Sequence, residues 1–149
     1  MHQQSQWNLR IASWHTDRMA LHAVREAVFI REQHVAPELE WDEFDTHCIH
    51  VLATNAVEGA IGTGRLLANG TIGRMAVLKA WRGKGVGRAI LLRLTGEARK
   101  QHLQQVALHA QLHAREFYRK FGFETRGEEF MEAGIPHIRM ILKLCGRVE

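Results

Sequence analysis

The sequence is poor in the residues that mark extracellular and membrane-spanning chains. Its 149 residues include two cysteines, two prolines and one tyrosine. Cys48 and Cys145 form no CxxC pair and no extracellular cysteine framework, so we expect reduced thiols in a cytoplasmic protein. Residues 1–14 hold no apolar run typical of a secretory signal, and no stretch approaches the roughly 20 apolar residues of a membrane span. We therefore expect no membrane partner.

Internal repeats, low-complexity tracts and linkers are also missing, which predicts a single domain over residues 1–149. The composition is 46% hydrophobic and 24% charged, as in ordinary globular proteins. A chain of this length buries roughly two thirds of its unfolded surface. Folding therefore needs neither a disulfide nor a structural metal.

Charge of one sign is concentrated in two segments, although the net charge is only +4. Residues 82–100 are basic, and they contain Arg82, Lys84, Arg88, Arg93, Arg99 and Lys100 against Glu97. Residues 38–45 are acidic, with Glu38, Glu40, Asp42, Glu43 and Asp45. A nucleic-acid binder would gain nothing from the acidic segment, so we expect no nucleic acid and a site that handles an anionic and a cationic partner.

The order of apolar patterns predicts an α/β protein of mixed strand direction with helices on both faces. We expect a strand at 7–11, then a helix capped by Thr16 or Asp17 that ends before Pro37. Strands are expected at 47–53, 60–67 and 71–77, the last two joined by the hairpin signal Asn69-Gly70. The strongest helical pattern covers 86–98. A strand at 106–110, a helix stopped by Gly122 and a final strand pair from Phe123 complete the chain.

The segment 82–88 has the features of a phosphate-binding loop. Its three glycines, Gly83, Gly85 and Gly87, let the backbone approach a ligand, and it precedes the strongest predicted helix. Unpaired N–H groups and the helix dipole favour an anion such as a pyrophosphate there. A glycine turn with solvated basic side chains is the alternative. The spacing fits neither GxxxxGK[ST] nor GxGxxG.

The motif that remains, R-x-x-G-x-G, resembles the acyl-coenzyme A signature [QR]-x-x-G-x-[GA] of the GCN5-related N-acetyltransferase (GNAT) superfamily. Arg82, Gly85 and Gly87 match it, and an aromatic segment at 114–123 matches a second feature of the superfamily. The resemblance covers nearly the whole chain. Shorter matches at 28–33, 38–45 and 134–137 look like the small bacterial ElaA/YjcF-type branch.

This resemblance implies a GNAT fold, a mixed and mostly antiparallel sheet of about six to seven strands in which strands four and five splay apart. It implies that acetyl-coenzyme A is the acyl donor and that its pantetheine arm bonds the exposed strand edge at Met75, Ala76 and Val77. One of their N–H groups could polarise the acyl carbonyl. The remaining cofactor-binding residues would be Arg82, Gly83, Lys84, Gly85, Val86, Gly87 and Arg88. No metal is expected.

Tyr118, the only tyrosine, matches the general acid of the superfamily, which protonates the thiolate of coenzyme A. An ordinary phenol pKa of about 10 lies close to a thiol pKa of about 8.5, so such a transfer is nearly balanced. The alternative is a tyrosine that only packs against Phe117 and Phe121.

The general base is harder to choose among ten histidines and many carboxylates. We name His137 and Glu32 as candidates, against the alternatives of a structural histidine and a solvated helix end. His109 is expected near the cleft, or else as a buried structural histidine. We expect His2, His15, His22 and His102 on solvated surface, and His47 and His50 on one strand, where their spacing does not favour a zinc site.

These inferences together indicate an N-acetyltransferase that transfers acetyl directly to a primary amine, without a covalent enzyme intermediate. The acceptor could be a small amine, an amino sugar, an amino acid or a protein amine, and a homodimer is left open. A coenzyme A-binding or regulatory module without turnover is the main alternative, and a nucleic-acid binder is a weaker one. The acidic segment would draw cationic acceptors, and Trp41 and Phe44 could pack over the substrate or anchor the segment.

Overall fold

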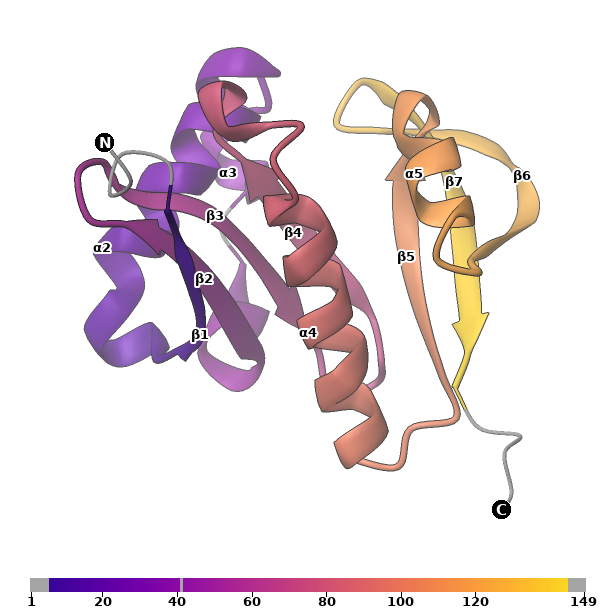
Figure 1. The fold of residues 1–149 in the computed structure, drawn as a ribbon. Helices are drawn as coiled ribbons and strands as arrows, with labels where there is room; N and C mark the ends of the chain where they lie inside the picture. Colours follow the sequence, from indigo (N-terminus) through magenta and orange to yellow (C-terminus); the bar gives the residue numbers. More distant parts are fainter. Residues whose placement is uncertain (1–5, 41, 145–149) are drawn as a thin grey trace.

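The computed structural model describes residues 6–40 and 42–144, which form two sheets (Figure 1). The first sheet has the order β1-β2-β3-β4, with β1 at Asn8–Ala12, β2 at Ile49–Asn55, β3 at Gly59–Leu66 and β4 at Ile72–Val77. The second has the order β5-β7-β6, with β5 at Gln105–Gln111, β6 at Glu124–Glu132 and β7 at Ile135–Lys143. Every pairing within a sheet is antiparallel. The expected α/β architecture of about seven strands is confirmed.

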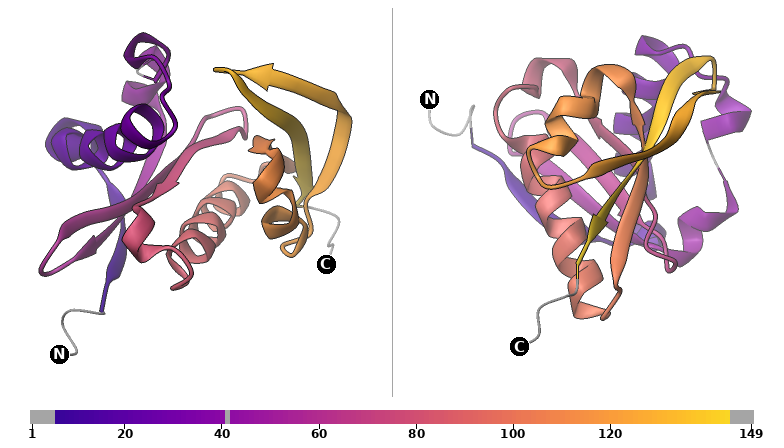
Figure 2. Two further views of the ribbon diagram at one scale, coloured as in Figure 1. Left: turned by 90° about the horizontal axis from the view of Figure 1, so that it is seen from above. Right: turned by 90° about the vertical axis from the view of Figure 1, so that its right-hand side faces the viewer.

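Two long helices cover opposite faces of the first sheet (Figure 2). Helix α2 (Trp14–Arg25) continues into a π-helical segment, η1 (Glu26–Glu32), and α4 (Val86–Lys100) packs on the other face. Helix α5 (Arg115–Arg119) lies beside the second sheet. Short helical turns fill the connections, namely α3 (Pro37–Glu40), η2 (Glu43–His47), η3 (Lys79–Trp81) and η4 (Leu112–Ala114). None of the helices in the described ranges is long and apolar enough to cross a membrane.

The start of α2 differs from the prediction. Its cap is Ser13, whose hydroxyl accepts a bond from the Thr16 N–H, while the Asp17 carboxylate accepts from the Ser13 N–H. Such reciprocal bonding satisfies two of the donors that a helix start leaves free. Arg10 of β1 adds two bonds of 2.9 Å to the same carboxylate. The predicted caps, Thr16 and Asp17, are therefore already inside the helix.

One hydrophobic core joins the two sheets through α4. Its buried members include Val51 and Ile61 of the first sheet, Ile90 and Leu94 of α4, and Met140 of the second sheet. Smaller clusters attach α2 to the opposite face of the first sheet through residues such as Leu21 and Val24. The two sheets therefore share one apolar interior while remaining separate in hydrogen bonding.

The separation of the sheets comes from β4 and β5, which run parallel and touch at one end. A single bridge pairs Thr71 with Ala107, and the Ala107 N–H donates to the Gly70 carbonyl at 3.0 Å. Gly70 has φ +92°, and a Cβ there would lie 2.8 Å from the Gln105 carbonyl oxygen, so only glycine fits. Beyond this end the strands splay, as the family resemblance implied.

A bulge bends β4 away from β5. Arg65 pairs with Gly73 and Thr63 with Ala76, so β4 carries one residue more than β3 across this interval. Arg74, in the bulge, adopts φ +50°, which is rare for a residue with a side chain. The bulge leaves the β5-facing edge of β4 available to a ligand.

Candidate functional site

The splayed strands open into a cleft with a volume of about 1020 Å³. Leu67 and Thr71 line its closed end. Toward the open end lie Met75, Ala76 and Val77 of β4 and Gly87 of α4, all named from the sequence as coenzyme A contacts. An extended, amide-bearing chain could follow the edge of β4 as an added strand would.

The glycine loop lies at the N-terminus of α4, a helix of 15 residues. Gly83 and Gly85 have φ of +78° and +88°, so the turn itself requires glycine, and a Cβ at either would meet nothing within 4 Å. The side chains of Lys84 and Arg88 are exposed, whereas Val86 is buried in the core. Because the first N–H groups of a helix lack intrahelical acceptors, this end can receive phosphate oxygens.

Arg82, the first residue of the motif, is held by other groups. Its two terminal nitrogens each donate to Glu32 at 2.7 Å, and Nε donates to the Val77 carbonyl at 2.9 Å. Arg82 therefore ties the glycine loop to η1 and to the end of β4. The free cationic side chains nearest the helix start are Lys84 and Arg88.

This ion pair changes the chemistry of Glu32, one of the two base candidates. Hydrogen bonding to Arg82 holds the pKa of the Glu32 carboxyl below its ordinary value. Glu32 does line the cleft. A carboxylate stabilised in its charged form accepts a proton less readily, so the pairing makes Glu32 the weaker of the two candidates.

Tyr118 reaches β4 from α5. Its hydroxyl lies 3.9 Å from the Met75 Sδ, and its ring packs edge-on against Phe117 and Phe123. Burial raises the pKa of Tyr118 to about 12. The phenol is thus protonated at neutral pH, as an acid must be, but its transfer to a thiolate is less balanced than an ordinary phenol pKa would make it.

His137 and His109 lie on neighbouring strands of the second sheet and both line the cleft. His137 is 6% exposed, its Nδ1 lies 2.6 Å from the Ile135 carbonyl oxygen, and Phe130 stacks on its ring. His109 is not buried, and its Nδ1 lies 2.7 Å from the Glu132 Oε1. The alternative of a buried structural histidine at position 109 is therefore wrong.

The acidic segment is only in part the solvated loop that its composition indicated, because Asp42 and Asp45 are paired with guanidinium groups. Asp45 is 1% exposed and accepts from Arg25 and Arg65, each at 2.8 Å through Nη1. Asp42 accepts from Arg65 at 2.7 and 2.8 Å and from Arg74 at 3.1 Å. These guanidinium groups hold the pKa of both carboxyls below their ordinary values. Two of the five acidic side chains are thus already paired with arginines, Asp45 in the interior and Asp42 partly exposed.

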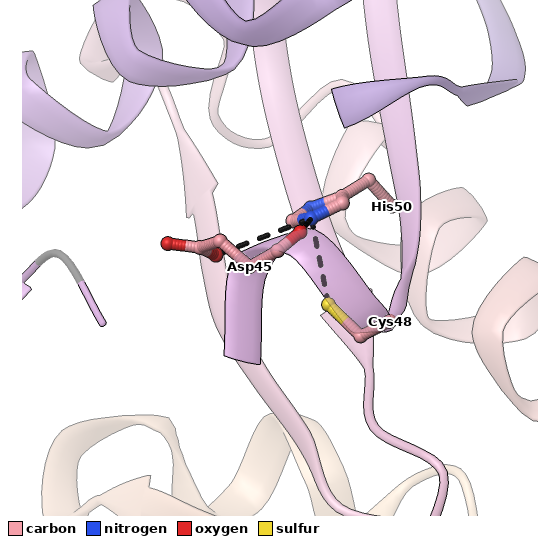
Figure 3. Close-up of side chains that lie close together, drawn as sticks. All are labelled: Asp45, Cys48 and His50. Atoms are coloured by element: carbon pink, nitrogen blue, oxygen red, sulfur yellow. Dashed lines mark hydrogen bonds and ion pairs between the residues drawn. The ribbon is translucent and has the colours of Figure 1, made fainter. Parts of the chain in front are cut away.

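Asp45 also belongs to a cluster with Cys48 and His50, whose ligand atoms lie within 4.8 Å of one another (Figure 3). The His50 Nε2 lies 2.8 Å from the Asp45 carbonyl oxygen and 3.4 Å from the Cys48 Sγ. Burial raises the pKa of the Cys48 thiol to about 11, so it stays protonated. A metal ion would also face the two guanidinium groups that already hold the Asp45 carboxylate. The cluster is therefore better suited to packing than to metal binding.

Several other expectations change or lie outside the described residues. His22 is partly buried, with its ring centroid 5.0 Å from that of Trp14. His47 ends η2 and does not lie on a strand. Phe44 lines the cleft at 49% exposure. His2, Trp41 and Cys145 lie outside the described residues. The expected strands and helices stand within a few residues of their observed bounds.

Sequence reasoning missed two features of the site. The bulge at Arg74 is the first, although Gly73 beside it is a residue type that often marks a bulge inside a strand. Glu132 was not named because its strand is rich in acidic residues that are merely solvated, such as Glu128 and Glu129. Only the hairpin between β6 and β7 could have indicated that Glu132 faces β5.

Comparison with known proteins agrees with this geometry. A family model described as an acetyltransferase (GNAT) domain matches residues 16–144. The Bacillus subtilis protein described as the uncharacterized N-acetyltransferase YjcF is 38% identical over 122 residues, covering 79% of this chain and 86% of that protein. Escherichia coli ElaA is 34% identical over 130 residues, covering 81% of this chain and 84% of ElaA.

Solved structures show the same fold. The crystal structure of E. coli ElaA superposes with a TM-score of 0.79 at 29% identity, covering 92% of this chain and 99% of that one. An acyl-CoA N-acyltransferase from Pseudomonas aeruginosa gives a TM-score of 0.81 at 29% identity, with the same coverage of 92% and 99%.

Proposed function

Because this chain belongs to the GNAT acetyltransferase family, we propose that it transfers an acetyl group from acetyl-coenzyme A directly to a primary amine. The family membership makes the protein an acyltransferase that uses an acyl-coenzyme A. Our proposal goes beyond the family membership in three points: the donor is acetyl-coenzyme A, the transfer is direct, and the acceptor is a primary amine.

The position of Tyr118 is the observation that supports this proposal. Its hydroxyl touches Met75 on the open edge of β4, at the level that a pantetheine arm would reach from the glycine loop. A thioester sulfur bound beside Met75 would lie next to a phenol that is protonated at neutral pH. Loss of the thiolate is the step that needs an acid, so the residue stands where that step would occur.

We assign the other residues by the groups that they present. Backbone N–H groups of residues 83–88, with Lys84 and Arg88, bind the phosphates, and Met75, Ala76 and Val77 bind the pantetheine arm. Arg82 holds the loop in place through Glu32 and Val77. The amine attacks the thioester carbon, the C–S bond breaks, and Tyr118 donates its proton to the leaving sulfur.

One wall of the acceptor half of the cleft is apolar. Phe29 and Val35 line it, and Leu39 and Phe44 stand exposed at its rim, at 58% and 49%. The nearby Asp42 is neutralised by Arg65 and Arg74. This lining favours an amine with an apolar side chain over a polycationic acceptor.

Titration calorimetry with coenzyme A, followed by acetyl transfer to a panel of primary amines, tests the proposal. We expect binding and, at a hundred times the dissociation constant, a stabilisation of about 2.7 kcal/mol. Gly85→Glu should abolish binding, because it adds negative charge beside the phosphates. Gly127→Glu is the matched control, since Gly127 has φ +80° and an equally open Cβ direction on β6.

Each arm of this experiment has a distinct meaning. A wild-type chain that fails to bind coenzyme A below millimolar concentration would refute the proposed site. Binding without transfer to any amine would favour a coenzyme A-binding module without turnover. Equal loss in both glycine variants would show that backbone strain, and not phosphate repulsion, abolishes binding.

A further inference from the structure

The second sheet presents a histidine–carboxylate pair to the cleft that has no evident structural purpose. The Nδ1 of His109, on β5, lies 2.7 Å from Oε1 of Glu132, the last residue of β6. Their side chains are 47% and 44% exposed, and both residues line the cleft. Figure 1 shows the β6–β7 turn at the same end of the molecule as the C-terminal end of β5. A half-exposed pair contributes little to stability, so stability does not explain its position.

We infer that His109 is the general base that deprotonates the substrate ammonium, and that Glu132 is its positioning residue. The inference rests on the proposed acetyltransferase function and assigns the base within it. With Glu132 accepting a hydrogen bond from Nδ1–H, Nε2 is left to take a proton, and the carboxylate stabilises the imidazolium that forms. Within residues 6–40 and 42–144, Nε2 of His109 has no hydrogen-bond partner.

The ring of His109 is held in one orientation. Phe130 meets it edge-on, with ring centroids 4.9 Å apart and an interplanar angle of 78°. Phe130 in turn stacks on the buried His137 at 6.0 Å. Packing of Phe130 between His137 and His109 thus holds the His109 ring in place. The bond to Glu132 fixes the tautomer of His109.

The strand register places His109 at the correct depth. The parallel bridge pairs Thr71 with Ala107, so His109 is level with Gly73, two residues from the closed end of the cleft. Met75, which touches the Tyr118 hydroxyl, is further toward the open end, on the other side of the bulge at Arg74. An amine between these two levels can meet His109 on one side and a thioester beside Tyr118 on the other.

His109 suits the task better than the two candidates named from the sequence. Glu32 is held as a carboxylate by Arg82. His137 could present Nε2, because its Nδ1 bonds to the Ile135 carbonyl, but it is 6% exposed and this neutral oxygen is a weaker partner for an imidazolium than a carboxylate. The charged and titratable groups around His109 are Glu132, Arg139 directly opposite on β7, His137 and, on the other wall of the cleft, Arg74.

The proton balance is simple. Nε2 of His109 takes one proton from the ammonium, and the freed electron pair attacks the thioester carbon. The C–S bond breaks and Tyr118 gives its proton to the thiolate. The second proton of the nitrogen restores Tyr118, and His109 releases its proton to solvent. One ammonium and one thioester therefore yield an amide, a thiol and one proton.

The test compares an acceptor that needs a base with one that does not. Phenethylamine is protonated at neutral pH and its ring suits the apolar rim, whereas hydroxylamine is mostly unprotonated and small. We expect His109→Gln to lower kcat for phenethylamine by roughly 10²- to 10⁴-fold and to change enzyme-dependent transfer to hydroxylamine by less than tenfold. Glu132→Gln should show the same selectivity with a smaller loss. Coenzyme A binding should be unchanged in both variants.

Matched variants separate this role from packing. His47→Gln, at an exposed position outside the cleft, and Glu129→Gln, at an exposed position on β6, should leave both acceptors unaffected. Equal losses for the two acceptors in His109→Gln, or selective loss in His137→Gln in its place, would overturn the assignment. So would a wild-type chain that acetylates hydroxylamine but not phenethylamine. Failure of the wild-type chain to bind coenzyme A would refute the proposed function itself.

Discussion

The buried ion-pair network beside the first sheet and the exposed pair of the second sheet use charged residues in opposite ways. In the first half of the chain, Arg25, Arg65 and Asp45 pair in the interior with side-chain exposures of 1%, 6% and 2%. In the second half, His109 and Glu132 pair on a surface that faces the cleft. Breaking a buried pair leaves an uncompensated charge, whereas an exposed pair can separate and change its protonation. The buried network therefore serves fixed structure, whereas the exposed pair at the cleft is free to change its protonation.

This difference predicts that substitutions of polar groups separate into two classes. Those in the buried network should lower the free energy of unfolding. Those on the cleft face of the second half should lower turnover and leave stability near that of the wild-type chain. Three measurements follow, from the largest expected effect to the smallest.

Tyr118→Phe should give the largest effect. It removes the hydroxyl and keeps the ring, so packing against Phe117 and Phe123 is retained. We expect kcat to fall by roughly 10² to 10⁴, with little change in coenzyme A affinity. Single-turnover kinetics isolate the chemical step from product release. An unchanged chemical rate would remove the acid assignment and leave the coenzyme A site as proposed.

Asp45→Asn should have the largest effect on stability. It leaves the buried Arg25 guanidinium beside a neutral amide, while Arg65 keeps its bonds to Asp42, and the loss should cost about 3–5 kcal/mol in urea denaturation. Glu116→Gln is the surface control, because its pair with Arg119 is exposed and should contribute less than about 1 kcal/mol. If both variants lose the same small amount, the contrast between buried and exposed pairs fails.

Lowering the pH should lower the free energy of unfolding gradually, and by less than the Asp45→Asn substitution does. Bonds from Arg10 and Ser13 lower the pKa of Asp17 from 3.8 to about 2, and Asp42 and Asp45 are shifted in the same direction. A carboxyl with a lowered folded-state pKa stabilises the fold above its ordinary pKa, and this contribution is lost as the pH falls through the lowered value. We therefore expect the free energy of unfolding to fall between about pH 4 and pH 2.

Urea denaturation at several pH values measures this decline. Asp17→Asn should make the slope between about pH 4 and pH 2 shallower, because one of the shifted carboxyls is gone. Stability that stays constant down to pH 2 would contradict the role given to these ion pairs.

The sequence predicted features that depend on local chemistry. Gly70 and the glycines at 83 and 85 have conformations that other residues reach only with strain, so the hairpin at Asn69-Gly70 and the loop before α4 could be located from them. The helix of 86–98 followed from its apolar period. Tyr118 could be named because the aromatic segment has a fixed place after the glycine motif.

The features that the sequence did not predict depend on contacts between distant residues. The acidic segment looked like a solvated loop because nothing local shows that Arg25 and Arg65 approach Asp45 from 20 residues away on either side. The apolar spacing of residues 26–32 also fits an ordinary α-helix, so it did not indicate that α2 continues as a π-helix. His109 and Glu132, 23 residues apart, meet only because the β6–β7 hairpin folds back and pairs with β5 through β7.

The contact at Gly70 is the point from which β4 and β5 diverge. At the Thr71–Ala107 bridge the backbones of β4 and β5 are about 5 Å apart, and β4 continues for about 20 Å beyond it. Because the strands meet here and diverge beyond, a change in their angle at this contact would displace the open end of the cleft by more than it displaces the contact itself. A side chain at position 70 would push against the Gln105 carbonyl oxygen at 2.8 Å. The width of the mouth of the cleft thus depends on the contact between β4 and β5 at its closed end, where the residue in closest approach has no side chain.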